Sequence, residues 1–293
     1  MDHMTAKVSC FSRAFHFRDN TDWIYKDDAA GKLLTEEEYK AIATNMTSGI
    51  SYFAPGFQGS GEEALRFIVE QFLSPSVLLR SAFCERAFRM QEESGVRQVL
   101  LFAAGYDSFA FHAGKEIHVF ELDQESLIEE KKERVAASGL MLHCSISYLA
   151  VDLSLAGWSA ALKEEGFHPE DGAFGSLLGI SYYLEKRVFR RLLLEIADIF
   201  QKDAAICFDY PAYEAGEASR KNRALAAEAR EEMKAEYTPD EMKELLRECG
   251  FQIRREIGSE EASEEFCEEW NRKNPGHRIL APGGVHYCLA VRS

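Results

Sequence analysis

Three turns, each at the end of an apolar run, carry the residue types best suited to hold a nucleoside. Gly105, Asp123 and the pair Asp152-Leu153 occupy these positions. A glycine lets the backbone approach a ligand closely because no Cβ intrudes. A carboxylate at the second turn can accept both ribose hydroxyls, and Asp152 with Leu153 is suited to meet an adenine amino group and pack against its ring. The pattern predicts a nucleoside site, although each turn alone is equally typical of a tight connection or a helix cap.

Apolar runs alternate with helical segments from about residue 97 onward, and this alternation predicts how the three turns are positioned. Strands that alternate with helices favour a parallel sheet covered on both faces. In such sheets ligands bind beyond the carboxyl ends of the strands, where the strand order reverses. The sequence therefore predicts an α/β fold with all three turns at one edge. The expected strands are 99–104, 117–123, 146–151, 174–180, 204–208, 251–257 and 285–291.

The segment before this alternation is rich in aromatic residues and has no strand-like period. Thr35 and Glu38 have the spacing of a capping box, which predicts a helix start. An amphipathic pattern predicts a helix over 62–73 that ends at Pro75. We expect a helical segment, residues 1–95, on a core, residues 96–293, within one compact domain. The other expected helices are 77–94, 125–138, 156–165, 184–200, 214–236 and one that begins after Thr238.

The glycine content of the first turn bears on which nucleoside ligand would bind. A dinucleotide-binding turn needs several glycines, because the backbone must approach the pyrophosphate at several points. Only Gly105 lies in this turn. The sequence therefore favours an adenosyl sulfonium, which carries no phosphate, over the cofactor of a nicotinamide-dependent oxidoreductase.

Composition excludes several other classes of protein. The 293 residues include 34 Lys and Arg against 49 Asp and Glu, a formal charge of −15, which repels nucleic-acid phosphates. No apolar stretch is long enough for a membrane span, and no signal-peptide pattern opens the chain. The seven cysteines are widely spaced without a CxxC pair, which predicts reduced thiols in a cytoplasmic protein and no metal site.

Four segments together resemble the leucine carboxyl methyltransferase-like family, whose bacterial members include O-methyltransferases associated with polyketide biosynthesis. The similarity covers most of the chain from about residue 8, including the helix around Arg80. No segment is specific alone, but the combination is. The four segments are 97–108, 120–123 with Lys131, 151–153 with Trp158, and 179–184.

This resemblance implies a class I methyltransferase fold that binds S-adenosylmethionine, with a seven-stranded sheet whose last strand is antiparallel. It implies that the turn containing Ala103 and Gly105 lies beside the methionine part of the cofactor. By the same analogy Asp123 holds the ribose, Asp152 and Leu153 meet the adenine, Arg80 binds the cofactor carboxylate, and Tyr183 lines the pocket. A planar guanidinium fork suits a carboxylate, although Arg80 could also be a surface cation.

The chain departs from the family pattern at four positions. Ala103 replaces the usual first glycine, which is tolerable if its φ is negative. Phe109 replaces an arginine, Ala82 replaces a second arginine, and Leu178 replaces an acid. These departures indicate a divergent member and leave open a binding or regulatory protein that has lost turnover.

Methyl transfer from a sulfonium is an in-line displacement, so the protein must align the acceptor and exclude water. The expected acceptor is a carboxylate or hydroxyl of a small molecule. The N-terminal segment is expected to form a helical lid over it. The sequence places no histidine at the methyl group, and it assigns neither a general base nor an oligomeric state. Aromatic candidates for the acceptor pocket are Tyr25, Phe53, Phe57, Tyr182 and Tyr210.

Overall fold

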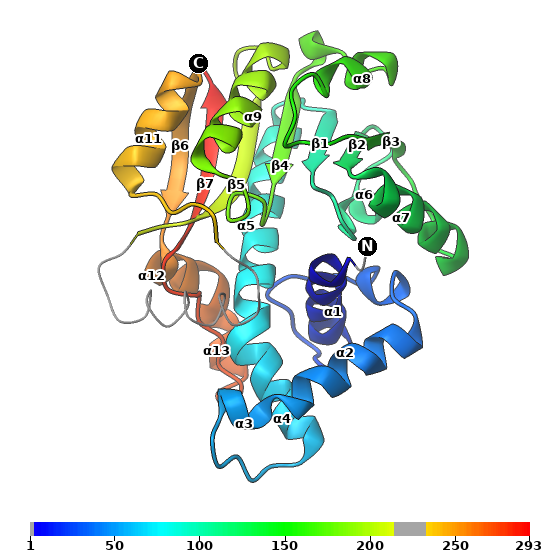
Figure 1. The fold of residues 1–293 in the computed structure, drawn as a ribbon, viewed down its shortest axis with the longest axis vertical. Coiled ribbons are helices and arrows are strands. Elements are labelled where there is room, and N and C mark those ends of the chain that lie inside the picture. Colours follow the sequence, from blue (N-terminus) through cyan, green and yellow to red (C-terminus); the bar gives the residue numbers. More distant parts are fainter. Residues whose placement is uncertain (1–2, 214–232) are drawn as a thin grey trace.

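One mixed sheet of seven strands forms the upper part of the molecule, together with the helices on its two faces (Figure 1). The computed structural model describes residues 3–213 and 233–293. The strand order is β3-β2-β1-β4-β5-β7-β6, and β7 runs antiparallel to both of its neighbours. This confirms the expected α/β fold with an antiparallel last strand. The strands are β1 (Gln98–Phe102), β2 (His118–Asp123), β3 (Ser145–Ala150), β4 (Ala173–Leu177), β5 (Ala205–Pro211), β6 (Phe251–Ile257) and β7 (Val285–Arg292).

Helices cover both faces of the sheet, as expected from the alternation of strands and helices. One face packs against α8 (Ser159–Glu164), α9 (Lys186–Ile199) and α11 (Pro239–Glu248). The other face packs against α5 (Ser74–Glu93), α6 (Phe109–His112), α12 (Ser259–Ala262) and α13 (Glu268–Lys273). Helix α7 (Glu125–Ser138) follows β2 and packs against β3. None of the described helices is both long and apolar enough to cross a membrane.

The N-terminal segment comprises α1 (Met4–Arg18), α2 (Glu36–Ser48), α3 (Ile50–Phe53) and α4 (Gly61–Ile68). The capping box is confirmed, because Thr35 Oγ1 accepts the Glu38 amide and the Glu38 carboxylate accepts the Thr35 amide. A third apolar cluster joins Phe11 of α1 to Tyr106 after β1 and to Leu127 of α7. The boundary at residue 95 remains a prediction, since α5 packs into the same core as the strands.

The expected helix end at Pro75 is wrong. Helix α4 continues through a π-type turn, Val69–Leu73, directly into α5, and Pro75 lies in the first turn of α5. Proline is tolerated there because the first N–H groups of a helix lack helical partners. Strand ends also differ, most of all in β4, which stops at Leu177, and in β5, which extends to Pro211. Of the expected helix 214–236, residues 214–232 lie outside the described residues and 233–236 are not helical.

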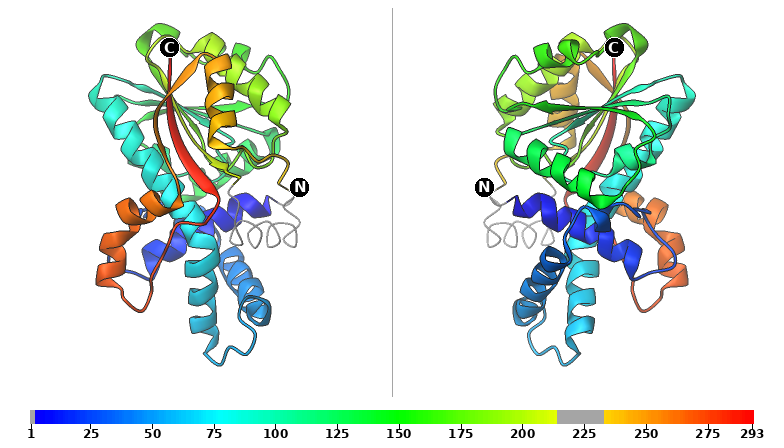
Figure 2. Two further views of the ribbon diagram at one scale, coloured as in Figure 1. Left: turned by 90° about the vertical axis from the view of Figure 1, so that its left-hand side faces the viewer. Right: turned by 90° about the vertical axis from the view of Figure 1, so that its right-hand side faces the viewer.

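The continuous passage from α4 to α5 moves two acceptor-pocket candidates away from the sheet. Helices α3 and α4 lie at the end of the molecule farthest from the strands (Figures 1 and 2). The Phe53 ring lies 4.8 Å from that of Phe72, and the Phe57 ring lies 6.0 Å from that of Phe67. Phe53 and Phe57 therefore pack within this arm, away from the strands, and their expected role in the lid over the acceptor pocket remains a prediction.

His16 of α1 joins the N-terminal segment to the C-terminal part of the chain. Its side chain is buried, its Nε2 accepts the Ile24 amide at 3.0 Å, and its ring lies 4.8 Å from that of Trp270. Burial lowers the pKa of His16 to about 4, and the charge of Arg66 acts in the same direction. His16 therefore stays neutral in the folded protein at a pH where the unfolded chain, with a pKa near 6.5, would protonate it.

We expect this histidine to make folding sensitive to acid. The stability that depends on neutral His16 is fully present above the pKa of the unfolded chain, and it is lost as the pH falls from about 6.5 toward 4. By pH 5 the free energy of unfolding should have fallen by an amount on the order of 2 kcal/mol. Urea unfolding at pH 7.5 and pH 5 should show this loss for the wild type and a smaller loss for His16→Gln, which keeps an acceptor but does not titrate. Equal losses in both proteins would contradict the assignment.

Candidate functional site

The turn that follows β1, residues 103–107 and called here the glycine turn, has an unusual backbone. Gly105 has a φ of +49° and Ala103 a φ of +53°. The negative φ that would make an alanine tolerable here is therefore not present. An alanine in the left-handed region costs roughly 1–2 kcal/mol, because its Cβ crowds the following carbonyl. The turn keeps this conformation only if other contacts hold it.

Asp123, the last residue of β2, supplies one of these contacts. Its Oδ2 accepts the Gly105 amide at 2.8 Å, and its Oδ1 accepts the Gln124 amide at 2.7 Å. Burial raises the pKa of Asp123, while the two amide donors oppose that shift. The side chain is only partly buried. Each oxygen retains a further lone pair, so this carboxylate can accept more donors.

A buried ion pair supplies the second contact. Lys131 of α7 lies 2.6 Å from Glu121 Oε2, and both side chains are almost completely buried. The Lys131 Nζ also donates to the Asp107 carbonyl at 2.7 Å. Burial raises the pKa of Glu121 to about 7, against the opposing effect of the lysine charge. The lysine thus ties the far end of the glycine turn to α7.

The N-terminal segment supplies the third contact through Arg13 of α1. Its Nη2 donates to the Tyr106 carbonyl at 2.6 Å, and its Nε donates to Asp27 Oδ2 at 2.8 Å. Asp27 is fully buried and also accepts the Ser108 hydroxyl at 2.5 Å. Although burial opposes the effect, hydrogen bonds from His112, Ser108 and Arg13 hold the pKa of Asp27 well below its usual range. Neither Arg13 nor Asp27 was predicted from the sequence, because nothing in their local pattern links them to residue 106.

Helix α1 also touches the glycine turn directly. A Cβ built on Gly105 would lie 3.3 Å from the Ala6 Cβ. The close approach for which the sequence predicted a glycine is thus made here by α1. This placement agrees with a helical cover at the carboxyl ends of β1 and β2, formed by residues near the chain start (Figure 1).

Arg80 reaches the same edge of the sheet from α5. Its guanidinium lies over Gly179, where a Cβ would be 2.5 Å from Nη1, and Nη2 donates to the Ser9 hydroxyl at 3.3 Å. The Arg80 side chain is 18% exposed, and its Nη1 lies 3.9 Å from Asp209 Oδ2. Arg80 is therefore a half-buried cation at the ends of β4 and β5. The alternative that it is a surface cation is wrong.

The turn after β3 places Asp152 and Leu153 differently. Asp152 is exposed, and its Oδ1 accepts the amide and hydroxyl of Ser154 at 2.8 and 2.6 Å. Those hydrogen bonds lower the pKa of Asp152. The cap of α8 is Trp158, so the alternative that Asp152 caps the next helix is wrong. Leu153 packs with Trp158 in the apolar core. The adenine roles of both residues remain predictions.

The tyrosines expected near the acceptor fall into two groups. Tyr182 donates from its hydroxyl to Asp209 Oδ2 at 3.0 Å, and the Tyr183 ring lies 6.3 Å away from that of Tyr182. Both follow β4, as expected. Tyr210 was expected just past strand five, but β5 extends to Pro211 and Tyr210 lies fully buried within it. Its hydroxyl bonds to Glu256, so Tyr210 contributes to the sheet core.

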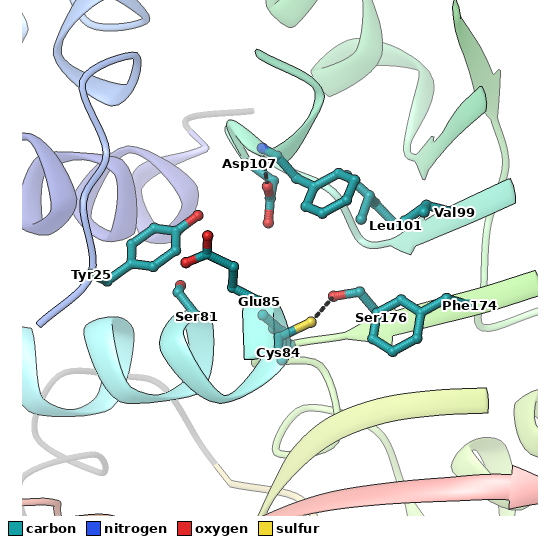
Figure 3. A pocket seen from close by; sticks show the side chains of 11 residues that line it. Tyr25, Ser81, Cys84, Glu85, Val99, Leu101, Asp107, Phe174 and Ser176 are labelled. Carbon is teal, nitrogen blue, oxygen red and sulfur yellow. Dashed lines mark hydrogen bonds between the residues drawn. The ribbon is translucent and has the colours of Figure 1, made fainter. Parts of the chain in front are cut away.

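A small pocket lies between α5 and the ends of β1 and β4 (Figure 3). The polar ends of Tyr25, Glu85 and Asp107 turn toward one another at one side of it. Phe109 and Leu178, two positions where the chain departs from the family pattern, both line this pocket. Two departures from the family pattern that lie far apart in the sequence therefore change the lining of the same pocket. The remaining lining residues are Ser81, Cys84, Val99, Leu101, Phe174 and Ser176.

Comparison with known proteins agrees with this geometry. Residues 6–197 match the leucine carboxyl methyltransferase family. The chain belongs to this family. It is also 29% identical over 302 aligned residues to YktD of Bacillus subtilis (strain 168), a candidate S-adenosyl-L-methionine-dependent methyltransferase, and the alignment covers 99% of this chain and 97% of YktD.

Solved structures show the same fold. A candidate methyltransferase from Thermobifida fusca YX superimposes with a TM-score of 0.58 and 13% identity, over 98% of this chain and 94% of that one. Magnesium protoporphyrin IX methyltransferase from Synechocystis PCC 6803, crystallised with bound SAH, gives a TM-score of 0.50 and 10% identity, over 88% and 97% of the two chains. The fold is that of the class I methyltransferases, and the family assignment favours S-adenosylmethionine over a nicotinamide dinucleotide.

The strain at Ala103 leads to a stability prediction. We expect Ala103→Gly to raise the free energy of unfolding by about 0.5–1 kcal/mol, because relief of the left-handed alanine exceeds the entropy cost of a glycine. The matched control is Ala104→Gly at the neighbouring buried residue, which has no positive φ and should lose about 1 kcal/mol. Urea unfolding measures both variants. Equal destabilisation by the two substitutions would show that the alanine is not strained.

Proposed function

We propose that this methyltransferase transfers a methyl group from S-adenosylmethionine to an oxygen of a small molecule, either a carboxylate or a hydroxyl. The observation that carries the proposal is a pair of opposite charges at the carboxyl ends of the strands. A carboxylate at the end of β2 contacts the turn, and a guanidinium lies at the ends of β4 and β5. A ligand with a ribose diol at one end and an amino acid at the other matches that arrangement.

The residues present fit the cofactor. Asp123 already accepts one amide on each oxygen, and the remaining lone pairs suit the two ribose hydroxyls. Arg80 uses one of its five N–H donors on Ser9, which leaves donors for a carboxylate. Asp152 is exposed beyond β3, and its carboxylate is the residue proposed to accept the adenine amino group. When bound, the cofactor supplies an activated methyl group with a neutral leaving group.

The chain's own residues have to orient the two reactants and exclude water. Alignment of an acceptor with the methyl carbon can supply a large share of the catalysis in such a displacement. Ala6 and Arg13 bring α1 onto the glycine turn, so the N-terminal segment can exclude water there. A carboxylate acceptor is already ionised at neutral pH and needs no base, whereas a hydroxyl benefits from one. Tyr25, Tyr182 and Tyr183 remain the proposed acceptor contacts.

The proposed setting is a reducing, cytoplasmic compartment. All seven cysteines are free thiols, and six of them are buried. The negative formal charge supports a small-molecule acceptor rather than a nucleic acid.

The ribose assignment predicts a binding defect. Asp123→Ala should weaken binding of S-adenosylhomocysteine by about 1–3 kcal/mol, because hydrogen bonds to the ribose and to the Gly105 amide are both lost. Isothermal titration calorimetry measures the dissociation constant, and thermal unfolding confirms that the variant is folded. A folded variant with an unchanged dissociation constant would refute the assignment.

Transfer itself is tested with methyl-labelled S-adenosylmethionine and a panel of small carboxylic acids, phenols and amines. We expect label in at least one oxygen acceptor, and loss of that label in Asp123→Ala at low cofactor concentration. Tight cofactor binding with label in amine or carbon acceptors only would contradict oxygen transfer. Tight binding without label in any acceptor would favour the binding protein that the sequence left open.

A further inference from the structure

Asp209 near the end of β5 is a buried carboxylate that the sequence analysis did not assign. Residues alternate between the two faces of a strand. Phe208 and Tyr210 belong to the cluster on the α9 face, whereas Cys207 belongs to the cluster on the α5 face. Asp209 therefore points to the α5 side, where Arg80 lies. Only 1% of its surface is exposed, so its charge requires partners.

Three groups compensate the Asp209 carboxylate. Its Oδ1 accepts the Gly179 amide at 2.7 Å, and its Oδ2 accepts the Tyr182 hydroxyl at 3.0 Å. Arg80 Nη1 lies 3.9 Å from Oδ2, close enough for strong attraction but too far for a hydrogen bond. The carboxylate thus fixes the turn after β4 by hydrogen bonds and Arg80 by charge.

Gly179 joins these contacts into one unit. Its φ is +70°, and a Cβ there would lie 2.5 Å from Arg80 Nη1. The guanidinium therefore rests directly on the turn that Asp209 holds. No other side chain could occupy position 179 without displacing Arg80.

The phenols near Asp209 stay protonated. Burial raises the pKa of Tyr182 well above its usual value, and the charge of Asp209 acts in the same direction. Tyr287 lies directly opposite Asp209 on β7, and its pKa is raised for the same two reasons, although the charge of Arg80 acts in the opposite direction. Among the described residues, Asp209 is the acidic side chain that forms an ion pair with Arg80. The unit therefore contains one negative and one positive charge.

We propose that Asp209 is a positioning residue for the cofactor, one that holds the Arg80 guanidinium in place for the ligand carboxylate. This inference rests on the proposed function, which assigns that carboxylate to Arg80. An unrestrained arginine would lose rotamer entropy when it binds a carboxylate, and Asp209 removes part of that cost before the ligand arrives. Because Asp209 attracts Arg80 without a hydrogen bond, it does not use the N–H donors that the ligand needs.

The test compares two ligands that differ in the amino-acid part. S-adenosylhomocysteine carries the carboxylate, whereas 5′-methylthioadenosine has the same nucleoside without it. Calorimetry measures both dissociation constants for the wild type, Arg80→Met, Asp209→Asn and Tyr182→Phe. The matched control is Glu70→Gln, which neutralises another buried carboxylate paired with an arginine, Arg66 at 2.8 Å, in the π-type turn between α4 and α5.

We expect Asp209→Asn to weaken the binding of S-adenosylhomocysteine about tenfold and the binding of 5′-methylthioadenosine by less than about twofold. Arg80→Met should show the same selectivity with a larger loss, and Glu70→Gln should change neither ligand. Should Asp209→Asn fail to fold, Tyr182→Phe tests the positioning role, because it removes a hydrogen bond that holds the Asp209 carboxylate but keeps its charge. It should weaken only S-adenosylhomocysteine, by a few fold.

The outcomes separate the inference from the function on which it rests. If Arg80→Met weakens both ligands equally, the proposed carboxylate contact is wrong. Arg80→Met could be selective while Asp209→Asn leaves the affinity for S-adenosylhomocysteine unchanged or increases it. Asp209 would then have no effect on ligand binding or would oppose it, and the positioning role would be overturned. Selectivity in Glu70→Gln would also overturn it, because a general loss of stability would then explain the effect.

Discussion

The left-handed conformation of the glycine turn is the constraint on which the site depends. Three consecutive residues of that turn each offer one backbone group to a charged side chain from a different element. The Gly105 amide donates to Asp123 of β2. The Tyr106 carbonyl accepts from Arg13 of α1, and the Asp107 carbonyl accepts from Lys131 of α7. These contacts offset the unfavourable φ at Ala103 and bring three elements to one edge of the sheet.

This arrangement couples structure to binding. Asp123 holds the turn and is also the residue proposed to hold the ribose, so a change there affects both. The N-terminal segment is joined to the turn by Arg13, which the fully buried Asp27 holds, and Ala6 of α1 lies against Gly105. That segment is therefore part of the site. At the neighbouring strand ends, Asp209 acts on Arg80 as the three charged groups act on the turn. In both places a buried charge fixes a backbone turn.

The sequence predicted the parts of the site that depend on local pattern. Asp123 was identifiable because a carboxylate ends an apolar run, and the sheet order places that run beside β1. The position of Phe53 was not predictable in this way, because a π-type turn lets the helix continue where a proline pattern indicates an end. Tyr210 was misplaced because β5 extends further than its apolar run. The pairing of Arg13 with residue 106 joins distant segments and leaves no local signal.

A crystal structure of this protein with S-adenosylhomocysteine tests the central claim most directly. The account predicts both ribose hydroxyls within hydrogen-bond distance of Asp123, the ligand carboxylate on Arg80, and the glycine turn unchanged with Ala103 still at a positive φ. A ligand bound elsewhere, or a turn that abandons the left-handed conformation when the ligand binds, would contradict it.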